Sequence, residues 1–344
     1  MKPFDLTAAP AADPLAVYRY RDGLYAVDLL TAALVYLDFF SWLAAHPSSD
    51  QEICKSLELA PRPADVMLTL FTASGFIRRQ PGHLEVTEAG REFLVKDSPW
   101  FMGPYYASLK DRPLTQDFLR VLRTNQPANW GSFKGEKDWS HAMETEEFAR
   151  HFTAAMDCRG VYLARALAQK LDLKNHHRLL DIAGGSGIYA CSLAAHFPHL
   201  RGMVFERPPV DKIVRSMVSQ RGFADRVEVA AGDMFHDPLP SGCDVHLFSN
   251  VLHDWDFPQV SALLENSFAS LPSGGLLVIH DAHINADKSG PLPVAQYSSL
   301  LMHSTEGKCY SVTEMSGLLA EIGFARIRFE ETAADRSALQ AVKP

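Results

Sequence analysis

The stretch Leu179-Leu180-Asp181-Ile182-Ala183-Gly184-Gly185-Ser186-Gly187 decides the fold of this chain. Its apolar residues on both sides of Asp181 predict a buried strand, its glycines predict a tight turn, and residues 189–195 predict the start of a helix. A strand that runs through glycines into a helix lets a ligand approach the backbone closely. The acid stands before the glycines, where it suits a ligand with a cationic amine and would repel a pyrophosphate. An ordinary strand-turn-helix corner is the alternative interpretation.

Two further predicted strands lead into acidic residues. Residues 202–206 form the first and end at Glu206, about 20 residues after the glycines, where a carboxylate would receive two ribose hydroxyls. Residues 227–231 form the second and are followed by Asp233 and Met234. There the acid could accept an adenine amino group while the methionine lies on the ring. Both positions therefore suit a ligand that contains adenosine.

The remaining segments continue an alternation of strands and helices. Residues 244–249 and 276–279 predict two more strands, and residues 326–330 and 338–342 predict a terminal antiparallel pair. This pattern predicts an α/β fold with a doubly wound, mostly parallel sheet. In such sheets ligands gather at the carboxyl ends of the strands, where four candidate residues fall: Asp181, Glu206, Asp233 and His253.

Four motifs in this order resemble those of a known family: Asp181-x-x-Gly-Gly-x-Gly, Glu206, Gly232-Asp233-Met234 and Leu252-His253-Asp254-Trp255. Together they look like the S-adenosylmethionine-dependent small-molecule O-methyltransferases of the plant caffeate and bacterial polyketide-tailoring type. The resemblance covers nearly the whole chain. It implies a Rossmann-like class I methyltransferase sheet behind an N-terminal, mostly helical winged-helix dimerisation domain. The cofactor-binding residues that it implies are Asp181, Gly184, Gly185, Glu206, Asp233, Met234, Phe235 and Ser249.

The resemblance also implies how the methyl transfer is catalysed. His253 matches the general base that takes a proton from the acceptor hydroxyl, a task that suits a group titrating near neutrality. Asp281 matches one acid that orients this base, and Asp254 lies next to the base in the sequence. Where the family has a second orienting acid, this chain has Cys309, with Glu306 nearby. This departure leaves open what orients the histidine on that side.

A helix predicted in residues 145–156 carries Phe148, Phe152 and Met156 at helical spacing. Core packing is one interpretation of these side chains. In the resembling family the matching helix lines the acceptor pocket, where aromatic and methionine side chains enclose a flat ring. We therefore expect a small aromatic acceptor, with substrate-binding residues that the resemblance extends to Phe148, Phe152, Met156, Asn250, Met302 and His303.

Three alternatives to O-methyl transfer remain open. Imidazoles and carboxylates can bind a metal ion, and the candidates are His253, His280, His283 and His303. A side branch of the family methylates carbon in aromatic 2-oxo acids with iron, held by histidines at positions that resemble His253 and His303. Other relatives keep the cofactor only as a fixed charge, although the presence of His253 argues against this. A regulator without activity should show degraded cofactor residues, which are intact here. We expect a site without a metal.

The first 100 residues predict helices followed by a β-hairpin, which is the order of a winged helix. Apolar residues are dense in residues 25–46, with a break expected near Asp38, and a further helix is expected in residues 61–74. On that helix, where base-reading side chains would lie, only Arg62 and Asp65 are charged. This pattern disfavours DNA binding.

In the resembling family the N-terminal domain contacts a second subunit. The excess of apolar residues between Ala26 and Leu43 fits a buried interface, so we expect a homodimer. The expected domains are a dimerisation domain in residues 1–100, a helical connector in 101–160 that contributes to the acceptor pocket, and a cofactor-binding domain in 161–344.

Composition agrees with a two-domain enzyme. The chain has 344 residues, which is long for one core, and its net charge of −8 argues against nucleic acid as a partner. The five cysteines are scattered without Cys-x-x-Cys spacing, so we expect reduced thiols, no zinc site and a cytoplasmic protein. Neither a signal-peptide core nor an apolar run of about 18 residues is evident, so no membrane partner is expected.

Overall fold

The computed structural model of the chain describes residues 4–128 and 143–344. The described residues belong to two compact units, each of which is treated by itself. The sheet unit comprises the described residues within Met1–Leu15, Gly135–His283 and Val312–Pro344, and the helical unit comprises those within Ala16–Lys134 and Ile284–Ser311. Part of the connector expected in residues 101–160 lies outside the described residues.

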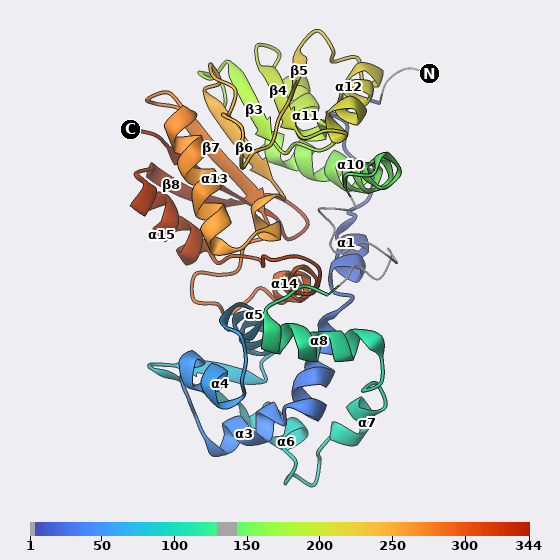
Figure 1. The fold of residues 1–344 in the computed structure, drawn as a ribbon, viewed down its shortest axis with the longest axis vertical. Helices are drawn as coiled ribbons and strands as arrows, with labels where there is room; N and C mark the ends of the chain where they lie inside the picture. Colours follow the sequence, from blue (N-terminus) through green and yellow to red (C-terminus); the bar gives the residue numbers. More distant parts are fainter. Residues whose placement is uncertain (1–3, 129–142) are drawn as a thin grey trace. The chain divides into compact units, whose positions relative to one another are not determined.

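The sheet unit contains seven strands in the order β5-β4-β3-β6-β7-β9-β8 (Figure 1). Strands β3 to β7 are parallel, whereas β9 pairs antiparallel with both β7 and β8. Their bounds are β3 (Arg178–Ile182), β4 (Arg201–Glu206), β5 (Val227–Ala231), β6 (Val245–Ser249), β7 (Leu276–Asp281), β8 (Ala325–Glu331) and β9 (Ser337–Val342). The predicted α/β class, the mostly parallel sheet and the antiparallel pair at the end of the chain are confirmed.

Helices accompany the sheet along its whole width. Figure 1 labels α10, α11 and α12 beside β3–β5, and α13 and α15 beside β6–β8. Their bounds are α10 (Glu146–Ala168), α11 (Ile188–His196), α12 (Val210–Gln220), α13 (Phe257–Ser270) and α15 (Val312–Ile322). All six residues of β7 are buried, as expected for an inner strand that is covered on both faces.

The strand order reverses next to β3, and a ligand site is expected at this reversal. From β3 the chain passes to β4 on one side, and after β5 it returns to β6 on the other side. In parallel sheets of this kind, ligands bind at the carboxyl ends of the two strands that flank such a switch point. Here those ends carry Asp181 on β3 and the residues that follow Ser249 on β6.

The helical unit has the predicted order of helices followed by a hairpin. Its elements are α1 (Leu15–Asp22), α2 (Ala26–Thr31), the π-helical turn η1 (Ala32–Tyr36), α3 (Phe39–Ala45), α4 (Asp50–Ser56), α5 (Pro61–Ala73), β1 (Ile77–Gln80), β2 (His83–Val86), α6 (Glu88–Leu94), α7 (Gly103–Ala107), α8 (Pro113–Thr124) and α14 (Leu292–Ser304). The break expected near Asp38 is confirmed, because Asp38 has a φ of 50° and separates η1 from α3.

Most of the dense apolar residues between Ala26 and Leu43 lie in a core, whereas Val27 and Tyr36 of this segment are exposed. Leu29, Phe39 and Phe40 are fully buried within the single chain, and the rings of Phe40 and Phe71 lie 5.1 Å apart. These side chains form the core of the helical unit, so they do not supply the surface of a dimer interface.

Helix α14 lies far along the sequence but belongs to the helical unit, where it contacts α5, α2 and α8. Arg62 of α5 is buried and donates hydrogen bonds to the carbonyl oxygens of Thr305 (3.2 Å) and Gly307 (2.6 Å). Asp65 pairs with Lys288 and Lys308. Arg62 and Asp65, the only charged residues on the helix considered for DNA binding, therefore bind residues of the chain's own segment 288–308. This grouping also differs from the domain limits expected at residues 100 and 160.

Among the described residues, no single helix is long and apolar enough to cross a membrane. Leu15–Tyr36 and Phe39–Ala45 meet the criteria of length and composition only together, as a pair bent by 60°.

Candidate active site

The turn between β3 and α11 has the backbone of a ligand-binding loop. Ala183, Gly185 and Gly187 all have positive φ values, of 53°, 57° and 71°. Gly185 and Gly187 adopt this conformation without the strain that a side chain would add. At Gly184 the reason for glycine is space, because a Cβ atom there would lie 2.6 Å from the carboxyl group of Asp181. The turn therefore packs tightly against the acid that precedes it.

Asp181 is fully buried at the carboxyl end of β3. Its Oδ2 atom accepts a hydrogen bond of 3.3 Å from the backbone N–H of Ala190, whereas its Oδ1 atom has no hydrogen-bond partner among the described residues. Burial raises the pKa of Asp181 to about 7, and the charge of Glu206 adds to this shift. A buried oxygen without a partner costs free energy unless a ligand donates to it.

Glu206 connects the end of β4 to the glycine turn. Its Oε2 atom accepts from the backbone N–H of Gly185 at 3.0 Å, and its Oε1 atom accepts from the N–H of Arg207 at 2.9 Å. Burial raises the pKa of Glu206 to about 7. The residue lies where the sequence predicted a ribose-binding carboxylate, and each carboxylate oxygen has further acceptor capacity.

The predicted adenine-binding residues lie after β5. Asp233 is partly exposed and accepts a hydrogen bond of 2.8 Å from the N–H of Phe235, which holds this loop in a turn. The Phe235 ring packs edge-on against Trp255 with centroids 4.6 Å apart, and Met234 is half-buried. The residues around Asp181 and Glu206 thus fit a ligand with an ammonium group and a ribose, while this loop offers an acid and apolar side chains for a base.

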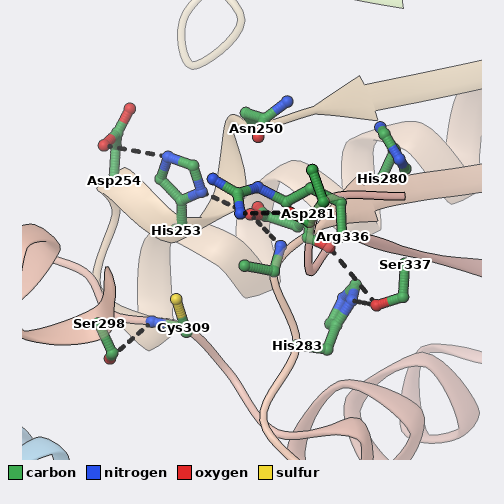
Figure 2. Close-up of polar contacts among 12 residues, drawn as sticks. Asn250, His253, Asp254, His280, Asp281, His283, Ser298, Cys309, Arg336 and Ser337 are labelled. Carbon is green, nitrogen blue, oxygen red and sulfur yellow. Dashed lines mark hydrogen bonds and ion pairs between the residues drawn. The ribbon is translucent and has the colours of Figure 1, made fainter. Parts of the chain in front are cut away.

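His253 lies in the short 3-10 helix η2 (Leu252–Asp254), which follows β6. Figure 2 shows its imidazole between two carboxylates: Nδ1 lies 2.5 Å from Oδ1 of Asp281, and Nε2 lies 3.6 Å from Oδ1 of Asp254. All three side chains are largely buried. Because a carboxylate only accepts hydrogen bonds, the proton of neutral His253 is on Nδ1. Nε2 therefore carries the lone pair that can accept a proton.

The charges of this group support one another. Burial acts to lower the pKa of His253, but the carboxylates of Asp281 and Asp254 outweigh burial and raise it above its usual value. Burial would raise the pKa of Asp281, yet the positive charge of His253 outweighs it and lowers that pKa to about 2. Burial raises the pKa of Asp254 to about 6. Asp281 is thus the ionised partner that holds and charges the imidazole.

The other histidines of the sheet unit that were considered as metal ligands have protein partners. His280 lies between the hydroxyl groups of Tyr189 (3.2 Å) and Thr332 (2.9 Å), and His283 lies 2.8 Å from the hydroxyl of Ser337. Burial lowers the pKa of His280 to about 3 and that of His283 to about 4. In the part of the chain that the structure describes, no group of three or more His, Cys, Asp and Glu residues is arranged to hold a metal ion.

The predicted acceptor-binding residues are divided between the two units. Phe148 and Phe152 of α10 stack with ring centroids 5.9 Å apart; Phe148 is buried, whereas Phe152 and Met156 are half-buried. Asn250 follows β6 in the same unit.

The helical unit holds the other two predicted acceptor-binding residues, Met302 and His303 of α14. Cys309, which stands where the family has a second orienting acid, is buried in the same unit, and its backbone N–H bonds to Ser298 (Figure 2). His303 is packed between the rings of Tyr25 and Phe118, each 5.0 Å away, and its Nε2 atom lies 3.7 Å from Asp117.

Tyr189 is a residue of the site that the sequence did not single out. It lies in the first turn of α11, and its hydroxyl contacts both Asn250 (3.0 Å) and His280. The available signal was a lone phenol, two residues after Gly187, followed by six small or apolar residues.

Comparison with known proteins agrees with this geometry. The family model described as the O-methyltransferase domain matches residues 115–325. The chain is 32% identical to the 3-hydroxy-5-methyl-1-naphthoate 3-O-methyltransferase of Streptomyces sahachiroi, over 89% of this chain and 88% of that protein. It is 30% identical to the tetracenomycin polyketide synthesis 8-O-methyltransferase of Streptomyces glaucescens, over 86% of each. The crystal structure of an O-methyltransferase family 2 protein from Planctomyces limnophilus in complex with apigenin matches with a TM-score of 0.89 and 32% identity, over 100% of both chains.

Proposed function

The chain belongs to the O-methyltransferase family, and from this premise we propose that His253 is the general base of its methyl transfer. The protein is an S-adenosylmethionine-dependent O-methyltransferase. The observation that carries the proposed role is the 2.5 Å contact between Nδ1 of His253 and Asp281, which leaves Nε2 to accept a proton. The acceptor is a small aromatic molecule. We assign to His253 the removal of the proton from the acceptor hydroxyl group that receives the methyl group.

The cofactor has a suitable place at the carboxyl ends of β3, β4 and β5. Asp181 offers an unpartnered buried oxygen to the ammonium group, and Glu206 offers carboxylate oxygens to the ribose. The adenine contacts are assigned to Asp233, Met234 and Phe235. When bound, S-adenosylmethionine supplies a methyl group on positively charged sulfur, which leaves as a neutral thioether. Gly184 and Gly185 leave the space that this binding needs, and Ser249 ends the neighbouring strand β6.

His253 provides the proton transfer that activates the acceptor. A phenol with an ordinary pKa of about 10 is mostly protonated at neutral pH and is then a weak nucleophile. Nε2 of His253 takes the hydroxyl proton as the acceptor oxygen forms its new bond to the methyl carbon. Asp281 stabilises the imidazolium that results, and Asp254 adds a second negative charge on the Nε2 side. The acceptor-binding residues must also hold the acceptor oxygen in line with the methyl group, because methyl transfer depends on this alignment.

The aromatic ring of the acceptor is assigned first to apolar side chains of α10. Phe152 and Met156 of α10 are only half-buried, so they retain surface for a flat ring. Phe148, Met302 and His303 complete the proposed set. The similar proteins from Streptomyces act on a naphthoate and in tetracenomycin synthesis, according to their names. An aromatic polyketide-type acceptor is therefore the substrate class proposed for this chain.

We also propose a homodimer and a cytoplasmic location. Several large apolar side chains of the helical unit are exposed in the single chain, and a second copy would cover them: Val17, Tyr20, Leu24, Val27, Tyr36, Phe93, Trp100, Met102 and Tyr105. No disulfide joins the five cysteines, which favours a reducing compartment. Sedimentation of the purified chain tests the dimer, with a Tyr20→Asp, Trp100→Asp variant expected to sediment as a monomer.

Transfer of a labelled methyl group from S-adenosylmethionine tests the proposed reaction. The acceptor panel contains phenols, catechols, hydroxynaphthoates and aromatic 2-oxo acids, each with and without a chelator. Labelling of a hydroxyl that is insensitive to the chelator supports the proposal. Labelling of a 2-oxo acid carbon that the chelator abolishes would instead favour the metal-dependent alternative with His253 and His303. Tight binding of the cofactor without any labelled product would favour a relative that does not transfer methyl groups.

A further inference from the structure

Two buried oxygen atoms at the ends of neighbouring strands have no hydrogen-bond partner among the described residues. They are Oδ1 of Asp181, on β3, and Oδ1 of Asn250, which directly follows β6. Strands β3 and β6 are paired in parallel, with Ile182 opposite Phe248, so both oxygens lie at the same edge of the sheet. This edge is the switch point of the strand order. A group that donates several hydrogen bonds and carries positive charge would satisfy both oxygens.

The orientation of the Asn250 amide is fixed by a chain of hydrogen bonds whose directions follow from chemistry. Oγ1 of Thr332 donates to the carbonyl oxygen of Arg336 (3.0 Å), so it can only accept from Nε2–H of His280 (2.9 Å). His280 is neutral because burial lowers its pKa to about 3, and its Nδ1 atom is then an acceptor. The hydroxyl of Tyr189 donates to this Nδ1 atom (3.2 Å). We call the side chains of Tyr189, His280 and Thr332 the relay.

The relay decides which end of the amide faces Tyr189. Since the Tyr189 hydroxyl gives its proton to His280, its oxygen can only accept, and it accepts from Nδ2 of Asn250 at 3.0 Å. The amide oxygen of Asn250 must then point away from Tyr189. The backbone supports this placement, because the N–H of Asn250 bonds to the carbonyl of His280 (2.9 Å) and its φ is 53°. Asparagine tolerates this left-handed conformation better than most residues.

We propose that Asn250, oriented by the relay, is a cofactor-binding residue that accepts a hydrogen bond from the α-ammonium group of S-adenosylmethionine, together with Asp181. Tyr189, His280 and Thr332 are positioning residues, because they act through Asn250. This inference deepens the proposed function and rests on it. It moves Asn250 from the acceptor-binding set, where the sequence placed it, to the cofactor site. The contact holds the methionine end of the cofactor beside the switch point, close in sequence to the short helix η2 that carries His253.

The test compares two ligands by calorimetry, so it needs no turnover. One is S-adenosylhomocysteine, and the other is its analogue that lacks the α-amino group but keeps the carboxylate. In wild type, the amino group should strengthen binding. Tyr189→Phe removes the donor that fixes the amide, and Asn250→Gly removes the amide at a position whose φ suits glycine. We expect both variants to bind S-adenosylhomocysteine about tenfold more weakly and the analogue with unchanged affinity.

A matched control is Ser267→Ala, which removes the 2.9 Å hydrogen bond to buried His246 in the same sheet unit and should leave both affinities unchanged. The inference is overturned if Tyr189→Phe and Asn250→Gly weaken both ligands equally or neither. If wild type binds neither ligand, the proposed cofactor site itself is wrong, which is a different outcome. Restored affinity in Asn250→Asp, which keeps an acceptor oxygen, would support the proposal further.

Discussion

Nδ1 of His253 lies 2.5 Å from Oδ1 of Asp281, although 28 residues separate the two in the chain. The sheet explains this contact, because β6 and β7 are parallel neighbours with Ser249 opposite His280. Asp281 is the next residue after that pair, and η2 turns His253 back towards it. The acid also accepts a 2.8 Å hydrogen bond from the N–H of Ala282, which fixes its carboxylate. Asp281, at the end of β7, therefore fixes the position of the His253 imidazole.

Replacement of His253 should abolish most of the chemistry and spare cofactor binding. In His253→Gln we expect the rate of methyl transfer to fall by about 10²- to 10⁴-fold, the usual contribution of a general base. Single-turnover kinetics with a phenolic acceptor measure this rate, and calorimetry with S-adenosylhomocysteine measures binding. His196→Gln, at the exposed end of α11, is the matched control. A variant that keeps the full rate would show that another group takes the proton.

The pH dependence of kcat should report the His253–Asp281 pair. The base must be unprotonated, so activity should rise with pH through the pKa of His253, which the carboxylates place above the ordinary value of 6.5. Asp281→Asn removes the negative charge, so the pKa of His253 should fall and the rise should move to lower pH. The plateau rate should also fall, by about 10- to 100-fold, because the imidazolium loses a charged hydrogen bond.

The control for this profile is Asp225→Asn, at an exposed position. It should leave both the midpoint and the plateau unchanged. If the midpoint of Asp281→Asn matched that of wild type, the charge of Asp281 would not control the base.

The sequence predicted the sheet well because its strands are marked by local patterns. Short apolar runs bounded by glycines or acids gave five parallel strands, and their ends gave Asp181, Glu206 and His253. The place of α14 was not predicted for a physical reason. Ten residues of this helix are buried, so no polar face marks which side meets α5, α2 and α8. The apolar segment around Phe40 was likewise assigned to an interface, since sequence alone does not separate a core from a contact surface.

The sequence located candidate residues at the strand ends, but it did not indicate the contacts made by Tyr189. The resemblance indicated that His253 and Asp281 belong together. The relay could not be predicted from the sequence, because Tyr189 and His280 are 91 positions apart and meet only through the packing of α11 on the sheet. The histidines instead raised a metal site as an alternative. His280 and His283 each bond to a hydroxyl group, and no local pattern encodes those partners.

The space at Gly184 gives a prediction about the cofactor turn. In Gly184→Ala the new Cβ would lie 2.6 Å from the carboxyl carbon and Oδ2 of Asp181, so the acid or the turn must move. We expect a loss of about 1–3 kcal/mol in the free energy of unfolding and weaker binding of S-adenosylhomocysteine. Gly317→Ala is the control, because it lies inside α15 with no atom within 4 Å of its Cβ. It should be neutral or stabilising, by up to about 1 kcal/mol. Equal effects of the two variants would contradict this account.

Arg62 separates a structural role in the helical unit from a DNA-binding role. Its guanidinium donates to Asn125 as well as to Thr305 and Gly307, so Arg62→Met should leave buried carbonyl oxygens unpaired. We expect the free energy of unfolding to fall by about 3 kcal/mol or more, measured by urea denaturation.

Arg78→Met is the matched control, because that arginine pairs with Glu85 at the surface and is 61% exposed. The control should change stability little, since exposed ion pairs contribute little. A titration with duplex DNA distinguishes the two roles. The structural role predicts no specific binding by wild type or by either variant. DNA binding by wild type that Arg62→Met abolishes, with little change in stability, would show instead that α5 faces a nucleic acid.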